Sequence, residues 1–466
     1  MRDLTKGSPV RALLLFAIPI IIGNILQLTY SLIDTRIVGQ LLGDNALAAV
    51  GAVSSMNTLI VGLCGGIGNG FAVIVARYFG AGENRGIQRS VAGAFSLGIF
   101  LTFILTLFSL LLLKPFLHLL HTPESIFNLS YQYIFIIIAG MIVTVLYNIS
   151  SAILRAIGDT VTPLIFLGCS TLLNIGGDLL FIGVFHQGVK GAALATILSQ
   201  ALSAAACVIY MFKKYPNLRF HSHDVLFRLR PLPKNLQSGN IKYLKRANFN
   251  LRLFLDLLTC GLSMGLMSCL VNIGSVALQM GINNLGNELI TAQMAARKIS
   301  EFYMILFSVF GTTMATYSGQ NFGAGEYGRI RQGMWKALEI TWVWCGLVIL
   351  LSYSPAGPFL IRLVTASNNP VIIDNAVLYL KINTLLYFIP AVICIVRNVM
   401  QGIGDHVTPI FSSFIECIGK VLITMLLVPH MKYMGIIIAE PVVWIFMVIP
   451  LLVKLVKNPI MKKQKN

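Results

Sequence analysis

The sequence is poor in charged residues. Only 11% of its 466 residues are Asp, Glu, Lys or Arg, whereas an average soluble protein carries about 25%. Hydrophobic residues make up 56% of the chain and the mean hydropathy is +0.80. These values exclude an ordinary soluble domain and predict a polytopic membrane protein of the all-α class.

Acidic residues are scarcer than basic ones, with 17 Asp and Glu against 35 Lys and Arg. In a soluble protein this surplus would suggest nucleic acid binding, but here the basic residues follow membrane topology. By our count 26 of them fall in segments on one side of the predicted spans, eight fall on the other side, and Lys420 lies within a span. The positive-inside rule therefore predicts a multi-pass protein of the cell membrane with both termini cytoplasmic, and no nucleic acid partner.

Several catalytic and metal-binding motifs are missing. The eight cysteines form no CxxC pair and the glycine-rich stretch 62–70 is not followed by GK[ST], so neither a zinc site nor an ATP-binding loop is indicated. We read overlapping GxxxG steps in 62–70 as a surface for close helix packing. Without a nucleophile–base set the chain is not expected to be an enzyme, and energy from an ion gradient is favoured over ATP.

Apolar segments long enough to cross about 30 Å of hydrocarbon occur twelve times. A basic segment, 213–252, separates two sets of six, so we predict an N-terminal lobe at 1–212, a cytoplasmic linker at 213–252, and a C-terminal lobe with a basic tail at 253–466. The predicted spans are 12–37, 46–76, 88–113, 126–153, 163–185, 190–212, 253–281, 288–318, 334–355, 372–397, 409–429 and 434–455.

The two sets are internal repeats. The sequence FGAGE at 79–83 recurs at 322–326, and IGDTVTP at 157–163 recurs as IGDHVTP at 403–409. Six spans in each half give the repeats the same orientation, an arrangement that builds transporters with two lobes. In the second motif the Gly and Pro are expected to end one helix and begin the next, and Asp159 and Asp405 to cap rather than to couple ions.

An aspartate in the first span is the strongest functional signal, because a carboxylate within the membrane costs roughly 2.5–3.5 kcal/mol and needs a partner or a wet cavity. Asp34 shares a helix face with Tyr30, four residues earlier. Pairing with Arg36 is the simpler alternative, although residues two apart do not face each other on a helix. We predict an ion- or proton-binding carboxylate.

Candidate partners for Asp34 occur in spans five and six. Asn174 and Asp178 are four residues apart, and Thr196 falls at a similar depth in the membrane. Together with Asp34 and Tyr30, these oxygens could coordinate Na⁺ or share a proton. The alternative is that Asn174 and Asp178 only hydrogen-bond to neighbouring helices.

The second half does not repeat this pattern. With offsets of 243 and 246 residues, Asp34 maps to Ala277 and Asn174 maps to Lys420. Glu416 and Lys420 are four residues apart in the order that favours an ion pair. We prefer pairing for them, with contact to a substrate in a cavity as the alternative.

These features resemble the multidrug and toxic compound extrusion (MATE) family, over essentially the whole chain, and are most similar to its DinF-like prokaryotic branch. The resemblance implies a cation-coupled antiporter that exports amphipathic, often cationic drugs or metabolites by alternating access of two lobes. It implies a cation site at Asp34, Tyr30, Asn174, Asp178 and Thr196, a helix bend at Pro19, and a cavity residue at Asn148.

No cofactor is expected beyond the coupling ion, H⁺ or Na⁺, and no other metal. We expect a monomer in the lipid bilayer that moves a small-molecule substrate. The alternative is a lipid-linked oligosaccharide flippase of the same superfamily, for which the cations Arg297, Arg397 and Lys420 would be suitable and the Asp34–Asp178 pair would not.

Overall fold

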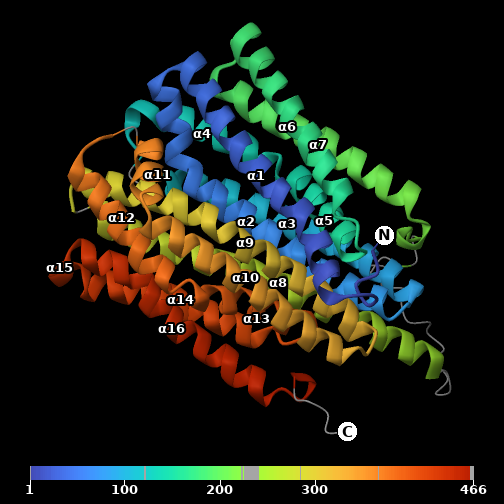
Figure 1. The fold of residues 1–466 in the computed structure, drawn as a ribbon. Helices are drawn as coiled ribbons and strands as arrows, with labels where there is room; N and C mark the ends of the chain where they lie inside the picture. The colour runs from blue at the N-terminus through green and yellow to red at the C-terminus, as the bar shows by residue number, and fades with distance from the viewer. Residues whose placement is uncertain are drawn as a thin grey trace. The chain divides into compact units, whose positions relative to one another are not determined.

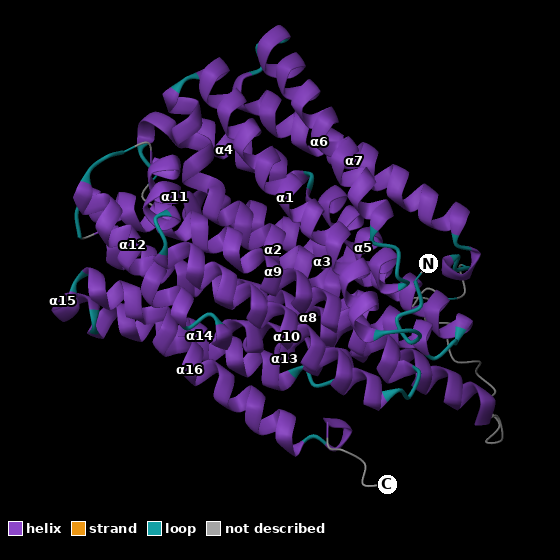
Figure 2. Cartoon of the chain, in the orientation of Figure 1, coloured by secondary structure: helices purple, strands orange, loops and turns teal. Residues whose placement is uncertain are grey.

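The computed structural model describes residues 2–119, 122–221, 224, 241–283, 285–365 and 367–461, with only the backbone over 241–250. Throughout these residues the ordered elements are helices and no strand is found (Figure 2). Part of the predicted linker, 222–223 and 225–240, lies outside the described residues, so the division at 213–252 stays a prediction.

The chain divides into two compact units, one made of Met1–Asp3 and Ile18–Gly265 and the other of Leu4–Ala17 and Leu266–Asn466. Two helices, α1 (Pro9–Leu42) and α8 (Ile241–Asn283), contribute to both units. In α1 the division falls between Ala17 and Ile18, next to Pro19.

Figure 1 follows the helices of the first unit in chain order from blue to green. Apart from its parts of α1 and α8, this unit contains α2 (Asp44–Gly80), α3 (Asn84–Leu119), α4 (Glu124–Ala139), α5 (Met141–Ala156), α6 (Val161–Asp178), the π-helical η1 (Leu179–Val184), α7 (Gly188–Lys214) and η2 (Pro216–Leu218).

The second unit follows in yellow to red. It contains α9 (Asn287–Gly323), α10 (Tyr327–Tyr353), α11 (Ala356–Thr365), α12 (Pro370–Leu385), α13 (Phe388–Ile403), α14 (Val407–Leu426), α15 (Val428–Met431), α16 (Tyr433–Lys457) and η3 (Pro459–Met461).

Ten of the described helices are long and apolar enough to cross a membrane, and two bent pairs of shorter helices pass the same test. Counting each pair as one span gives the twelve spans that the sequence predicts. The pairs are α4 with α5, bent by 47°, and α12 with α13, bent by 53°. The predicted class, an all-α polytopic membrane protein, is confirmed.

Helix boundaries confirm the internal repeat. Helices α2 and α9 have 37 residues each, and both ends of α9 follow those of α2 by 243 residues. Helices α4 and α12 have 16 residues each, and both ends differ by 246 residues. The bends therefore occupy equivalent places, and both halves break their fourth span.

Glycines allow α2 to approach α8 closely within the first unit. A Cβ added at Gly66 would lie 2.5 Å from the Met264 carbonyl oxygen, and one at Gly70 would lie 2.4 Å from the Cys260 carbonyl oxygen. Such distances leave no room for any side chain. The prediction of close helix packing from the glycine stretch is confirmed.

The repeated turns use the same geometry in both units. Gly158 and Gly404 have φ angles of +84° and +102°, a left-handed conformation that glycine adopts without strain. The next residue accepts bonds from the following helix: Asp159 from the N–H and hydroxyl of Thr162, and Asp405 from those of Thr408, at 3.1 and 2.7 Å in each case. The capping prediction for both aspartates is confirmed.

Asp159 accepts one more hydrogen bond, at 2.6 Å from the Tyr215 hydroxyl. Burial alone would raise the pKa of Asp159, but the bonds from Tyr215 and Thr162 stabilise the carboxylate and hold its pKa below the ordinary value. A lowered pKa in the folded state stabilises the fold above the unfolded-state pKa, about 3.9, and this stabilisation is lost as the pH falls through the folded-state value.

We therefore expect Asp159→Asn, which keeps the shape but not the charge, to lower the free energy of unfolding by about 1 kcal/mol at pH 7. The difference from the unmodified chain should shrink as the pH falls below the unfolded-state pKa, about 3.9, toward about pH 2. Thermal unfolding of both purified proteins at the two pH values measures this. A gap that stays constant with pH would show that the charge of Asp159 is not involved.

Candidate functional site

The first unit brings together the side chains predicted as a cation site. Asp34 and Tyr30 come from α1, Asn174 and Asp178 from α6, and Thr196 from α7. Asp178 is the last residue of α6, directly before the π-helical turn η1. Such π-helical segments within α-helical spans often occur at functional sites.

Asn174 is at the centre of this cluster. With its amide nitrogen facing α1, Nδ2 lies 3.1 Å from the Tyr30 hydroxyl oxygen and 3.0 Å from Asp178 Oδ2. Its amide oxygen then lies 3.2 Å from the Thr196 hydroxyl oxygen. One amide therefore links three helices and has all its hydrogen-bonding groups satisfied, as a buried amide requires.

The carboxyl groups of Asp34 and Asp178 lie close enough to act on each other directly. Two ionised carboxylates only accept hydrogen bonds and repel each other, so their closeness favours a shared proton or a bound cation. The Asp178 side chain is completely buried and Asn174 is only 2% exposed. A full double negative charge here would be very costly, so the pair is suited to binding one proton or one cation.

Two further oxygens of the pair, Oδ1 of Asp34 and Oδ1 of Asp178, have no hydrogen-bond partner among the described residues. They are acceptors only, and buried acceptors without partners are uncommon. Oxygen ligands of this kind, with the Thr196 and Tyr30 hydroxyls, also fit a hard cation such as Na⁺. The chemistry of these groups suits either H⁺ or Na⁺, and the identity of the coupling ion stays a prediction.

Sequence reasoning missed Tyr133, a buried side chain of α4 that lies in the electrostatic field of both Asp34 and Asp178. A tyrosine within an apolar span carries no charge signal, and only the packing of α4 places it beside the carboxyl pair.

Two residues implied by the family resemblance lie outside this cluster. Asn148 is on α5, where its backbone packs 3.5 Å from the position of a Cβ on Gly68, and no hydrogen bond between described residues joins it to the five. Pro19 lies within the continuous helix α1, eleven residues before Tyr30. Roles for Asn148 in a cavity and for Pro19 in bending stay predictions.

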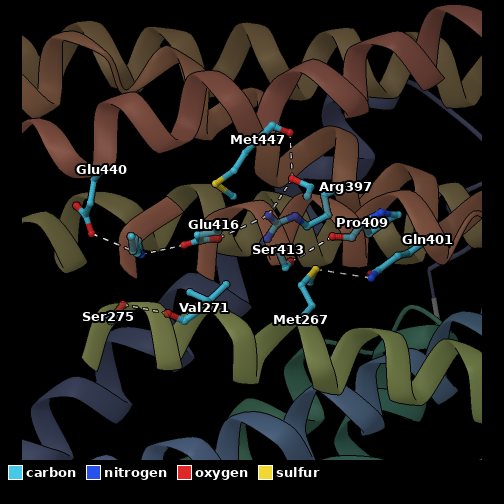
Figure 3. A network of polar contacts seen from close by, with 12 residues as sticks. Met267, Val271, Ser275, Arg397, Gln401, Pro409, Ser413, Glu416, Glu440 and Met447 are labelled. Atoms are coloured by element: carbon cyan, nitrogen blue, oxygen red, sulfur yellow. Dashed lines mark hydrogen bonds and ion pairs between the residues drawn. The ribbon is translucent and has the colours of Figure 1, made fainter. Parts of the chain in front are cut away.

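A second polar network lies within the second unit (Figure 3). Lys420 and Glu416 of α14 form the predicted ion pair, with Lys420 Nζ 2.9 Å from Glu416 Oε1. Lys420 Nζ also lies 3.8 Å from Glu440 Oε1 on α16, and the other oxygen of Glu440 accepts a hydrogen bond of 2.8 Å from the Tyr379 hydroxyl. The prediction of an ion pair is confirmed, and a contact of these residues with substrate stays untested.

The sequence analysis did not single out Glu440. It lies within the last predicted span, 434–455, and the cost of a carboxylate in the membrane, the rule that identified Asp34, applies to it as well. Its partners, Lys420 and Tyr379, come from two other helices. Glu440 also attracts the positive charge of Arg297 on α9.

The two units differ in chemistry at equivalent positions. Lys420 takes the place of Asn174, and Thr424, which takes the place of Asp178, donates its hydroxyl to the Lys420 carbonyl oxygen at 2.7 Å. Two neighbouring aspartates therefore characterise the first unit, and paired charges of both signs characterise the second. The predicted asymmetry of the halves is present in the side-chain contacts.

Comparison with known proteins is consistent with this architecture. The model of the MatE family matches residues 19–180 and 264–426, one segment in each repeat. The chain is 29% identical over 329 residues to the probable multidrug resistance protein YpnP of Bacillus subtilis, covering 70% of this chain and 68% of that protein. It is 22% identical over 446 residues to the FAD transporter of Shewanella oneidensis, covering 94% and 92%.

Among solved structures, the fold is similar to the outward-facing conformation of a multidrug resistance MATE family transporter of the MOP superfamily. The TM-score is 0.84 at 21% sequence identity, and the alignment covers 99% of this chain and 98% of that one.

Proposed function

Because the chain belongs to the MatE family, whose members are membrane transporters and not enzymes, we propose that it is an antiporter that exports amphipathic molecules in exchange for H⁺ or Na⁺. The observation that carries the proposal is the closeness of the Asp34 and Asp178 carboxyl groups, each with a buried Oδ1 that has no partner among the described residues. A pair that shares one charge-compensating ion can bind and release that ion as its surroundings change.

Alternating access supplies the mechanism. A ligand shifts a conformational equilibrium only through its different affinities for the two states. Loading of the Asp34–Asp178 pair with H⁺ or Na⁺ therefore favours one state, and substrate favours the other. Exchange of the two ligands drives the cycle.

Helix α1 is the element that connects ion binding to the conformational change. It carries Tyr30 and Asp34, and it belongs to the second unit up to Ala17 and to the first unit from Ile18. Proline in a helix interior removes one backbone hydrogen bond, so Pro19 would let the part of α1 that carries the carboxylate bend when the ion binds.

The remaining parts of the proposal come from sequence. Lobes at 1–212 and 253–466 with a linker at 213–252, cytoplasmic termini, location in the cell membrane and function as a monomer are all retained. For substrates we propose amphipathic drugs or metabolites, with cations included. The names of two relatives, a probable multidrug resistance protein and an FAD transporter, support export of this range and do not favour the flippase alternative.

Efflux from cells tests the proposal. Cells that express the chain are loaded with ethidium, and pH and Na⁺ gradients are imposed separately. We expect efflux to follow one of the two gradients, which identifies the coupling ion. Lack of efflux from cells with verified surface expression would contradict the proposal, as would efflux that depends on neither gradient.

A further inference from the structure

Arg397 has a hydrogen-bonding capacity that its neighbours do not satisfy. It lies on α13 of the second unit and is only 6% exposed. Nη2 donates a 3.3 Å bond to the Ser412 hydroxyl oxygen, whereas the buried Nε has no partner among the described residues. A buried charged donor without an acceptor costs more than a neutral one.

The carboxylate nearest to Arg397 is already paired. Glu416 Oε2 lies 3.7 Å from Arg397 Nη2, whereas Glu416 Oε1 lies 2.9 Å from Lys420 Nζ. The other acid of the network, Glu440, contacts Lys420 and interacts with Arg297. Three cations thus share two carboxylates, and Nε of Arg397 has no acceptor among the described residues.

Glu301 does not offset the positive charge of Arg397. It is exposed, and it interacts with Arg297, which stands one helical turn away on α9. Figure 3 places Arg397 with Glu416 on one side and Pro409 and Gln401 on the other. The guanidinium of Arg397 therefore has one shared carboxylate, Glu416, and an Nε without an acceptor among the described residues.

The neighbours of Arg397 can make room for a ligand. Ser412, which accepts from Arg397, donates to the Met447 carbonyl oxygen at 3.1 Å, and Gln401 donates to the sulfur of Met267 at 3.8 Å. Figure 3 shows both methionine side chains beside the network. Methionine is unbranched and flexible, so it can rearrange at little cost.

We propose that Arg397 is an anion-binding subsite, which receives a carboxylate or phosphate group of the exported amphipathic molecule. A planar guanidinium binds such groups with two parallel hydrogen bonds. The inference rests on the proposed function, and it adds that the substrates include molecules with both an apolar body and an anionic group. A substrate with a cationic group and a carboxylate satisfies both requirements.

Norfloxacin and its ethyl ester provide matched probes, because they share a fluorescent ring system and a basic amine and differ in the carboxylate. Their binding to the full chain is measured by fluorescence anisotropy in nanodiscs of phosphatidylcholine, so that no anionic lipid competes. We expect norfloxacin to bind about tenfold more tightly than the ester, as for one charge-assisted contact.

Variants assign this preference to Arg397. Arg397→Gln should weaken norfloxacin binding about tenfold and leave binding of the ester unchanged, whereas Arg397→Lys should keep part of the preference. Arg362→Gln is the matched control, because it removes one positive charge from an exposed position of α11 in the same unit. It should keep the full preference.

Equal binding of acid and ester by the unmodified chain would overturn the inference, and this comparison needs no variant to fold. So would an equal loss of both ligands in a folded Arg397→Gln, which is the result expected of a purely structural arginine. Ethidium has no carboxylate, so failure of its gradient-driven efflux tests the proposed antiport and not this subsite.

Discussion

Asp34→Asn is expected to abolish coupled efflux while the protein still folds and reaches the membrane. Asparagine keeps the shape of the side chain, but it neither takes up a proton nor offers a negative charge to Na⁺. The site would then no longer distinguish the two states, and the coupling is lost. We expect gradient-driven ethidium efflux to fall about 100-fold, near the upper end of typical coupling energies.

The measurement compares efflux rates at equal surface expression. Asp44→Asn is the matched control, since Asp44 is an exposed residue at the start of α2, outside the carboxyl pair, and this variant should export at the normal rate. Normal gradient-driven efflux by Asp34→Asn would reduce Asp34 to a structural residue and remove the site assignment.

Gly70→Ala is expected to destabilise the first unit strongly. The added Cβ would lie 2.4 Å from the Cys260 carbonyl oxygen and 2.6 Å from the Gly261 Cα. Both are backbone atoms, which move only if α2 and α8 separate. Overpacking of this kind costs about 1–3 kcal/mol or more, so we expect a large decrease in the unfolding temperature and in the yield of folded protein.

Gly65 offers a control on the same helix. A Cβ at Gly65 meets no atom within 4 Å, and alanine is a better helix former than glycine by about 1 kcal/mol. Gly65→Ala should therefore match or exceed the unmodified chain in thermal unfolding. Similar unfolding temperatures for the two variants would mean that α2 and α8 do not pack through their glycines.

Much of the fold follows from the sequence because the membrane imposes simple rules. Apolar length predicts the spans, and the repeated turns predict two equivalent halves. The breaks in the fourth and tenth spans were not predicted. At the second break Pro390 explains the bend, because its ring would clash with the carbonyl of Leu386 in a continuous helix.

The first break depends on packing between helices. A Cβ at Gly140, between α4 and α5, would meet the Ile197 side chain of α7 at 2.5 Å. Gly140 therefore leaves room for α7 at the bend. A glycine in an apolar span does not reveal which helix it will face, so this contact could not be read from the sequence.

For the candidate site as well, the sequence predicts some contacts and leaves others open. Spacing alone pairs Tyr30 with Asp34 and Asn174 with Asp178, because each pair occupies one helix face. The contact of Asp34 with Asp178 joins α1 to α6, and the contact of Arg397 with Glu416 joins α13 to α14. Contacts between helices depend on their depth and rotation, which the sequence leaves open.

The central claim is that ion and substrate exchange through the Asp34–Asp178 pair. Proteoliposomes test it most directly: the purified chain is given an ethidium gradient and no initial ion gradient, and H⁺ and Na⁺ movements are recorded. We predict that ethidium flux drives one ion in the opposite direction through the unmodified chain and none through Asp34→Asn. Equal ion movement through both proteins would contradict the account.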